Sequence, residues 1–181
     1  MIMPVAELRQ YFTTDESDEV LEAKLQALEL MIRAYTNNNF QHRGYRAVAD
    51  LRAGVLMMEA LQPFNTGDTV QIHGSRYNDG LYTVTETNDS TATVKEDTVD
   101  ESGVMVTKVV YPADIKMGVV KLLKWDLERG DKVGVASETI SRHSVTYFDM
   151  AGDNSVMGYP KALLGFLRPY HRARFGQGVR V

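Results

Sequence analysis

Two segments with a helical spacing of apolar residues constrain the fold of this chain more than any other feature. The first runs from about Asp15 to Asn37 and opens with carboxylates, which complement the dipole of a helix N-terminus. The second runs from about Pro112 to Gly130, with a proline suited to a first helical turn and a glycine suited to a helix end. Their apolar residues recur at intervals of three and four: Leu21, Leu25, Leu28, Ile32 and Tyr35, then Ile115, Val119, Leu122, Leu123 and Leu127. Each stripe needs a partner, and we expect the two helices to bury their stripes against each other.

The sequence between these helices predicts a small antiparallel β unit over roughly residues 44–111. Apolar and polar residues alternate in short runs, and clusters rich in Asn, Asp, Ser and Gly separate the runs. The expected apolar face consists of Val70, Ile72, Tyr82, Val84, Ala92, Val94, Val104 and Val106. Residues 44–62 are ambiguous, because a helix and two strands on either side of a turn near Gly54 fit equally well.

The last third of the chain predicts a hairpin, a short helix and a tail. Residues from Val133 to Met150 look extended, and Tyr159–Leu167 reads as a short helix that Pro169 ends. Residues 170–181 are rich in Arg and Gly without apolar periodicity, so we expect them to be mobile in the isolated chain.

These elements predict an α+β fold whose core is a small antiparallel helical bundle. Two long helices and the short C-terminal helix would form the bundle from residues 1–43 and 112–168, which also carry the projecting β-hairpin at 133–150. Residues 44–111 would be an inserted antiparallel β subdomain, and 169–181 a flexible basic tail.

Charge is distributed unevenly along the 181 residues. The formal net charge is −4, but residues 1–153 carry 15 basic and 24 acidic side chains, whereas residues 154–181 carry five basic ones and no acid. An acidic body should repel nucleic acid, and the basic end should seek an acidic surface or phosphates. No apolar run reaches the ~18 residues of a membrane span, and the first residues do not resemble a signal peptide. We therefore expect a soluble protein that is made and used inside a cell.

The sequence offers little for catalysis or metal binding. It contains no cysteine, and its four histidines occur singly, without a metal-ligand spacing. A hydrolytic triad could be drawn from Ser137, Ser141 or Ser144 with His143 and Asp149, but side chains diverge along one extended segment, and no nucleophile-elbow motif accompanies them. We predict that the chain is not an enzyme and uses no cofactor or metal.

The order of several motifs resembles the head-tail connector, or adaptor (head completion), family of long-tailed bacteriophages and prophages. The segments that carry the resemblance are Ala34–Phe40, Gly67–Ile72, Asn78–Tyr82, Ala136–Tyr147 and Gly158–Tyr170. They cover most of the chain, and their order is more specific than any one of them. The resemblance also favours strands over a helix in residues 44–62.

The resemblance implies a structural subunit of the virion neck, assembled in the cytoplasm of the bacterial host. About twelve copies would form a ring beneath the portal protein, with a stopper or tail-completion protein on the other side. DNA would pass through the channel without sequence-specific binding. The C-terminal segment would dock on the portal.

Two sets of residues are therefore candidates for assembly contacts. Arginines interleaved with aromatic residues are typical of interface hot spots, and the expected portal-docking residues are Arg168, Tyr170, Arg172, Arg174 and Phe175. Edge strands suit pairing between chains, and the expected subunit–subunit residues are Ser137, Glu138, Ile140, Arg142, His143, Val145 and Tyr147. An ordinary hairpin and a solvated tail without function remain open for these segments. For the whole chain, the alternatives are a nucleic-acid-binding module that uses the basic tail and the β unit, or a small hydrolase.

Overall fold

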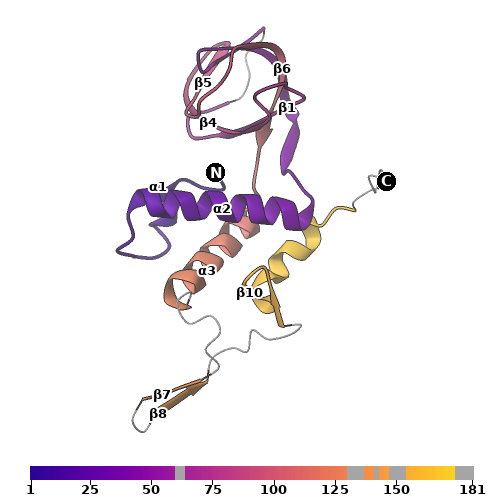
Figure 1. Ribbon diagram of the computed structural model, residues 1–181. Helices are drawn as coiled ribbons and strands as arrows, with labels where there is room; N and C mark the ends of the chain where they lie inside the picture. Colours follow the sequence, from indigo (N-terminus) through magenta and orange to yellow (C-terminus); the bar gives the residue numbers. More distant parts are fainter. Residues whose placement is uncertain (60–63, 130–136, 141–142, 147–153, 174–181) are drawn as a thin grey trace. The chain divides into compact units, whose positions relative to one another are not determined.

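The computed structural model describes residues 1–59, 64–129, 137–140, 143–146 and 154–173 (Figure 1). The chain divides into two compact units. The barrel unit comprises Met1–Pro4 and Asn39–Tyr111, and the helical unit comprises Val5–Asn38 and Pro112–Val181.

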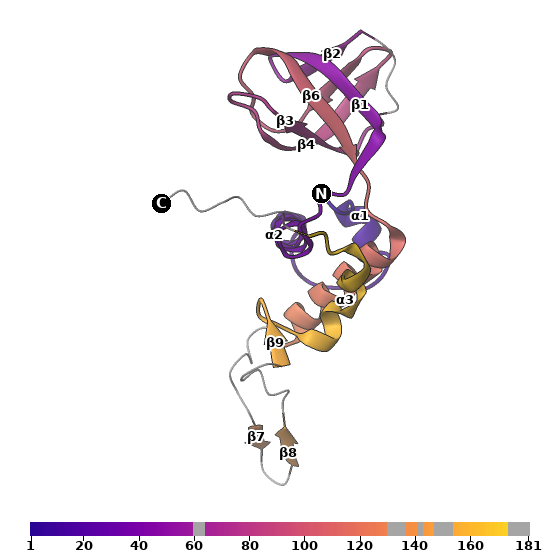
Figure 2. The same ribbon diagram turned by 90° about the vertical axis from the view of Figure 1, so that its right-hand side faces the viewer.

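The barrel unit is a closed antiparallel barrel of six strands. In sequence order these are β1 (Gln41–Arg52), β2 (Val55–Met58), β3 (Thr69–His73), β4 (Gly80–Asn88), β5 (Thr91–Val94) and β6 (Glu101–Val109). Around the barrel the order is β1-β2-β5-β4-β3-β6, and β1 pairs with β6 to close it. Figure 2 shows β1 and β6 lying side by side. Of the ambiguous residues 44–62, the structure describes 44–59, and these form strands, with Ala53 and Gly54 at positive φ in the turn between β1 and β2.

The interior of the barrel is filled by the alternating apolar residues of its strands. All eight positions that the alternation assigned to the apolar face are buried, which confirms that part of the prediction. Phe64 and five further strand positions complete the core: Ala47, Ala49, Leu51, Leu56 and Met58. Closure leaves neither β1 nor β6 as an open edge, so the sheet buries its apolar face without help from a helix.

The predicted fold is wrong about what forms the core. The chain is α+β, but its core is the six-stranded barrel, accompanied by the N-terminal helix and one helix in the middle of the chain, and not a helical bundle with a β insert. The apolar stripes show that two helices must be covered, but they do not specify the partner. In the helical unit, α2 (Asp18–Thr36) and α3 (Ala113–Arg129) cross steeply instead of lying along each other (Figures 1 and 2). α3 packs more extensively on the C-terminal helix than on α2.

The ends of α2 follow from its flanking sequence. Ser17 is the N-cap, and its side chain accepts a hydrogen bond from the backbone N–H of Val20 at 3.4 Å. Asn37 caps the other end in the left-handed conformation, where its backbone N–H donates to the Arg33 carbonyl. The stripe residues Leu21, Leu25, Leu28 and Ile32 are buried, as the spacing predicted.

Shorter elements complete the helical unit. These are α1 (Val5–Leu8), the paired strands β7 (Ser137–Ile140) and β8 (His143–Thr146), the paired strands β9 (Ser155–Val156) and β10 (Tyr159–Pro160), and the 3₁₀ helix η3 (Lys161–Tyr170). The predicted short helix is therefore a 3₁₀ helix, and Pro169 lies inside it and does not end it. Leu164 and Leu167 are its buried residues.

Candidate functional site

The C-terminal end of the described chain is fastened to the end of α2. The backbone N–H of Arg172 donates to the Thr36 carbonyl at 2.8 Å. The side-chain amide of Asn37 donates to the carbonyls of Arg172 and Ala173, at 3.4 and 3.2 Å. The amide of the buried Asn38 donates to the Tyr170 carbonyl at 3.2 Å. We call residues 168–173 the anchor segment, because these bonds hold its backbone in place.

Asparagine is suited both to ending α2 and to binding the backbone of the anchor segment. It tolerates the left-handed conformation better than most residues with a Cβ, and Asn37 adopts φ 50° and ψ 36° there. The turn ends the helix and leaves the side-chain amides of Asn37 and Asn38 available to carbonyl groups of the anchor segment. The residues that stop the helix are therefore the ones that hold the C-terminal chain.

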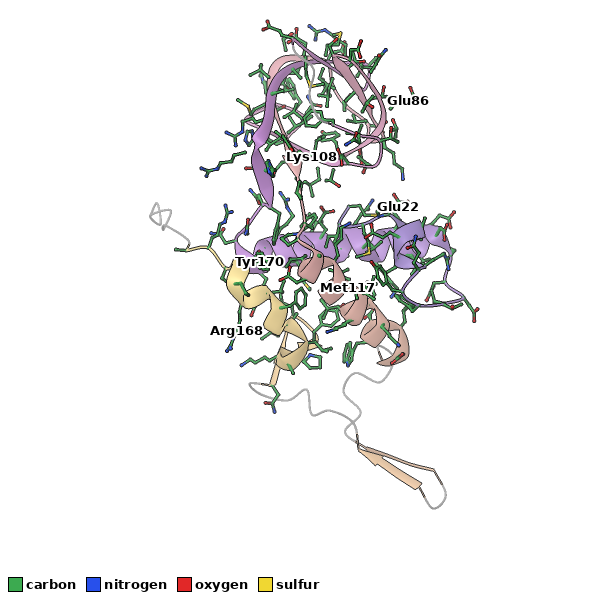
Figure 3. All side chains as sticks on the ribbon, turned by 180° about the vertical axis from the view of Figure 1, so that it is seen from behind. Glu22, Glu86, Lys108, Met117, Arg168 and Tyr170 are labelled. Atoms are coloured by element: carbon green, nitrogen blue, oxygen red, sulfur yellow. The ribbon has the colours of Figure 1, made fainter. Side chains whose placement is uncertain are left out.

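Aromatic contacts fasten the same segment from two further sides. The Tyr170 hydroxyl donates to the Asp114 carboxylate, which lies in the first turn of α3. The His171 ring packs edge-on against Tyr35, with ring centroids 4.6 Å apart. The hydrogen bond to Asp114, followed by partial burial and the charge of Asp114, raises the pKa of the Tyr170 hydroxyl. Figure 3 shows Tyr170 and Arg168 on this part of the chain.

The predicted portal-docking residues fall into two groups. Arg168 and Arg172 lie on the anchor segment with exposed side chains, whereas Tyr170 is half-buried and bonded to Asp114. Arg174 and Phe175 lie outside the described residues. The prediction missed Thr36, Asn38 and Asp114, although the Asn37-Asn-Asn39 run was a visible signal that side-chain amides gather at this point.

The predicted subunit–subunit residues lie in or beside the pair β7–β8. Its register places Ser137 opposite Thr146, Glu138 opposite Val145, and Ile140 opposite His143. Among the described strands, neither β7 nor β8 pairs with a third strand. Arg142 and Tyr147 lie outside the described residues, as do Ser141 and Asp149 of the alternative hydrolytic triad.

A cleft of about 310 Å³ lies between α2, α3 and Tyr159. Its lining is mostly apolar, and its two charged groups, Lys24 and Asp126, form an ion pair at 2.8 Å. Burial, with a smaller effect of the Asp126 charge, raises the pKa of the Tyr159 hydroxyl to about 12. This tyrosine therefore stays protonated at neutral pH and acts as a packing residue beside Trp125, whose ring centroid is 5.4 Å away.

Within the ranges that the structure describes, no three His, Asp or Glu side chains are grouped so that they could hold a metal ion. No helix among those residues is both long and apolar enough to cross a bilayer. A comparison with protein-family models gave no match, and neither did a comparison with curated proteins.

Proposed function

We propose that this chain is a structural subunit of the neck of a tailed bacteriophage, one copy of an adaptor ring between the portal and the tail. The observation that supports this most is the anchor segment. Its hydrogen bonds connect the first and the last of the segments that carry the family resemblance. Asn37 and Asn38 belong to Ala34–Phe40, and residues 168–170 belong to Gly158–Tyr170.

The anchor segment is suited to presenting a docking tail. Its backbone is held by Thr36, Asn37 and Asn38, so the chain that follows Ala173 starts from a fixed point. A partner that binds this chain then has fewer residues to order, which favours affinity. The exposed guanidinium groups of Arg168 and Arg172 lie at that point and would face an acidic surface of the portal.

The pair β7–β8 supports the ring. Two strands alone are marginally stable in water, and each has an outer edge with backbone groups that no described strand uses. Addition of a strand from the neighbouring copy would satisfy these groups and give a head-to-tail contact, which is the type of contact that closes a ring.

Truncation after Ala173 tests portal docking. Removal of residues 174–181 leaves the bonds of the anchor segment intact, whereas truncation at residue 169 would also remove them and confuse docking with folding. In the phage that encodes the chain, we expect the truncated form to give filled heads and free tails in electron micrographs. Arg174→Ala with Phe175→Ala should do the same, and Gln177→Ala with Val179→Ala is the matched control in the same segment. Normal joined particles from the truncated chain would disprove the docking role.

Replacement of Glu138–Val145 by a Gly-Ser linker tests the ring. The described contacts of the helical unit and the barrel lie elsewhere, so the thermal transition of the purified chain should stay unchanged. Rings should be lost from neck preparations in electron microscopy. Rings that form as well as in the parent chain would exclude subunit contact through β7–β8.

A further inference from the structure

The barrel carries a local basic surface that the proposed neck function does not require. In the pairing of β1 with β6, Gln41 stands opposite Val109 and Arg46 opposite Thr107. Four residues of β1, 42–45, therefore stand opposite Lys108 alone. Such an irregularity bends a strand out of its ladder and redirects its side chains. We call residues 42–46 together with Lys108 the basic bulge.

The side chains of the basic bulge form an ordered cluster. The rings of His42 and Tyr45 are stacked, with centroids 4.2 Å apart and an interplanar angle of 21°. The Lys108 ammonium lies 5.8 Å from the centroid of the Tyr45 ring (Lys108 is labelled in Figure 3). The Arg46 guanidinium donates from Nε to the Thr107 hydroxyl at 3.1 Å, which fixes the position of this guanidinium.

The β1 side chains of the basic bulge are open to solvent. Residues 42–46 are all exposed, and Tyr45 keeps 36% of its surface accessible. Arg43 forms no side-chain hydrogen bond or ion pair with any residue that the structure describes. Its charge is therefore available to a ligand.

The basic bulge contrasts with the rest of the barrel unit. The unit contains six Lys and Arg residues against ten Asp and Glu residues, yet three of the six basic residues lie in the bulge. The acid paired with a charge of the bulge is Asp68, which lies 2.5 Å from the Lys108 ammonium. Arg43 and Arg46 thus give a local positive surface on an otherwise acidic unit.

We propose that the basic bulge binds the phosphodiester backbone of nucleic acid. Arg43 and Arg46 would contact phosphate oxygens, and the exposed rings of His42 and Tyr45 would stack with an unpaired base. Guanidinium groups beside flat aromatic rings are the combination that single-strand-binding surfaces use, because every base has a face that can stack. An acidic peptide would need the cations but not the stacked rings, so nucleic acid fits the whole cluster better. This inference does not depend on the ring.

The number of cations limits the strength of binding. With about two phosphate contacts, the affinity for duplex DNA should fall with salt at a log–log slope of about −2. Such a surface would hold DNA weakly in low salt and release it readily near physiological ionic strength.

Fluorescence anisotropy of the full-length chain with a labelled duplex and a labelled oligothymidylate tests the proposal between about 20 and 200 mM KCl. Arg43→Ala with Arg46→Ala should weaken both complexes at least about tenfold in low salt and make the duplex slope shallower by about 2. Arg52→Ala with Arg76→Ala is the matched control. It removes the same charge from exposed arginines elsewhere on the barrel, and it should leave the affinity within about threefold of the parent chain.

A second pair of variants tests stacking. Tyr45→Ala should weaken the oligothymidylate complex at least about fivefold and the duplex complex less, whereas the exposed Tyr77→Ala should change neither. Thermal melts of each variant verify that the barrel is folded. The proposal is overturned if the parent chain binds neither DNA in low salt, if both arginine pairs have the same effect, or if polyglutamate binds as tightly as DNA with the same dependence on Arg43 and Arg46.

Discussion

The Tyr170 hydroxyl donates to the Asp114 carboxylate, lying 2.7 Å from Oδ1 and 2.8 Å from Oδ2. The bond connects the last turn of η3 with the first turn of α3, between residues that are 56 positions apart. Asp114 thus has two favourable interactions, one with the helix dipole and one with the phenol. The described C-terminal end belongs to the folded unit through this contact and the bonds to Asn37 and Asn38.

Tyr170→Phe should lower the free energy of unfolding by about 1 kcal/mol, because it removes a hydrogen bond between a half-buried tyrosine and a charged acceptor. Urea denaturation followed by circular dichroism measures the change. Tyr11→Phe is the control in the same unit, since Tyr11 is 46% exposed and its hydroxyl has no bond with the described residues. Equal stabilities of the two variants would show that the Asp114 bond contributes nothing.

Alkaline pH should destabilise the helical unit. Tyr170 and Tyr159 both have raised pKa values in the folded chain, the first mainly through its bond to Asp114 and the second, at about 12, mainly through burial. A tyrosine titrates near 10 when unfolded. The stability that the two protonated tyrosines contribute is therefore complete below about pH 10. It is lost as the pH rises through their pKa values in the folded chain. Denaturation midpoints between about pH 8 and 12 should fall less steeply in Tyr159→Phe than in the parent chain, and parallel curves would contradict the assignment.

The ring of Phe166 leaves no room for a side chain at position 118. A Cβ at position 118 of α3 would overlap that ring, which belongs to η3. Gly118→Ala gains about 0.5–1 kcal/mol of helix propensity but forces the ring to move, at about 1–3 kcal/mol, so we expect a net loss of stability. In a Phe166→Ala background the same substitution should stabilise the chain by about 0.5–1 kcal/mol. A double-mutant cycle in urea measures both values, and a Gly118→Ala effect of the same sign in both backgrounds would refute the overlap.

The Glu101 carboxylate should stabilise the conformation of the loop between β3 and β4. It accepts hydrogen bonds from the Ser75 hydroxyl at 2.5 Å, the Arg76 backbone N–H at 2.8 Å and the Asn78 amide at 2.8 Å. These bonds, that of Arg76 first, lower the pKa of Glu101. The stability that ionised Glu101 contributes is therefore present above the ordinary glutamate pKa near 4.3. It is lost as the pH falls through the lower pKa of Glu101 in the folded chain.

Glu101→Gln should accelerate hydrogen exchange at the Arg76 amide, because a neutral acceptor holds the N–H more weakly. Glu86→Gln is the control, since that side chain is exposed on β4 (Figure 3) and forms no hydrogen bond with the described residues. Exchange measured by NMR at neutral pH compares the two variants. Unchanged exchange at Arg76 would mean that the loop is held by other contacts.

The sequence predicted the individual helices and strands better than it predicted which elements pair or pack with each other. The alternation of apolar and polar residues correctly identified the inward faces of two strands, with Val70 and Ile72 on one and Val104 and Val106 on the other. Burial of one sheet face imposes that period. It could not show that β1 returns to pair with β6 and closes the sheet, since Ala47 and Val106 meet across 59 positions of sequence. The bundle prediction failed for this reason: an open sheet needs a covering layer, and a closed one does not.

The anchor segment was hidden for a similar reason. Asn37 signalled the end of a helix, which is a local property of the left-handed conformation. Its second task, to bind the carbonyl of Ala173, links residues 136 positions apart, and no periodicity records such a pairing. The charge and aromatic content of residues 168–175 indicated an interface but could not show that Tyr170 already has a partner within the chain.

Two of the three points at which the chain passes between the units, 38–39 and 111–112, lie beside barrel ends that are held together. The Val110 N–H donates to the Phe40 carbonyl at 2.9 Å, and the rings of Phe40 and Tyr111 have centroids 4.9 Å apart. Once the barrel has folded, the long connection between α2 and α3 behaves as a very short loop. By the logarithmic dependence of loop-closure entropy on length, this lowers the barrier to bringing the two helices together by about 2–3 kcal/mol. The coupling is mutual, because helices that pack together also bring the two ends of the barrel segment close to each other.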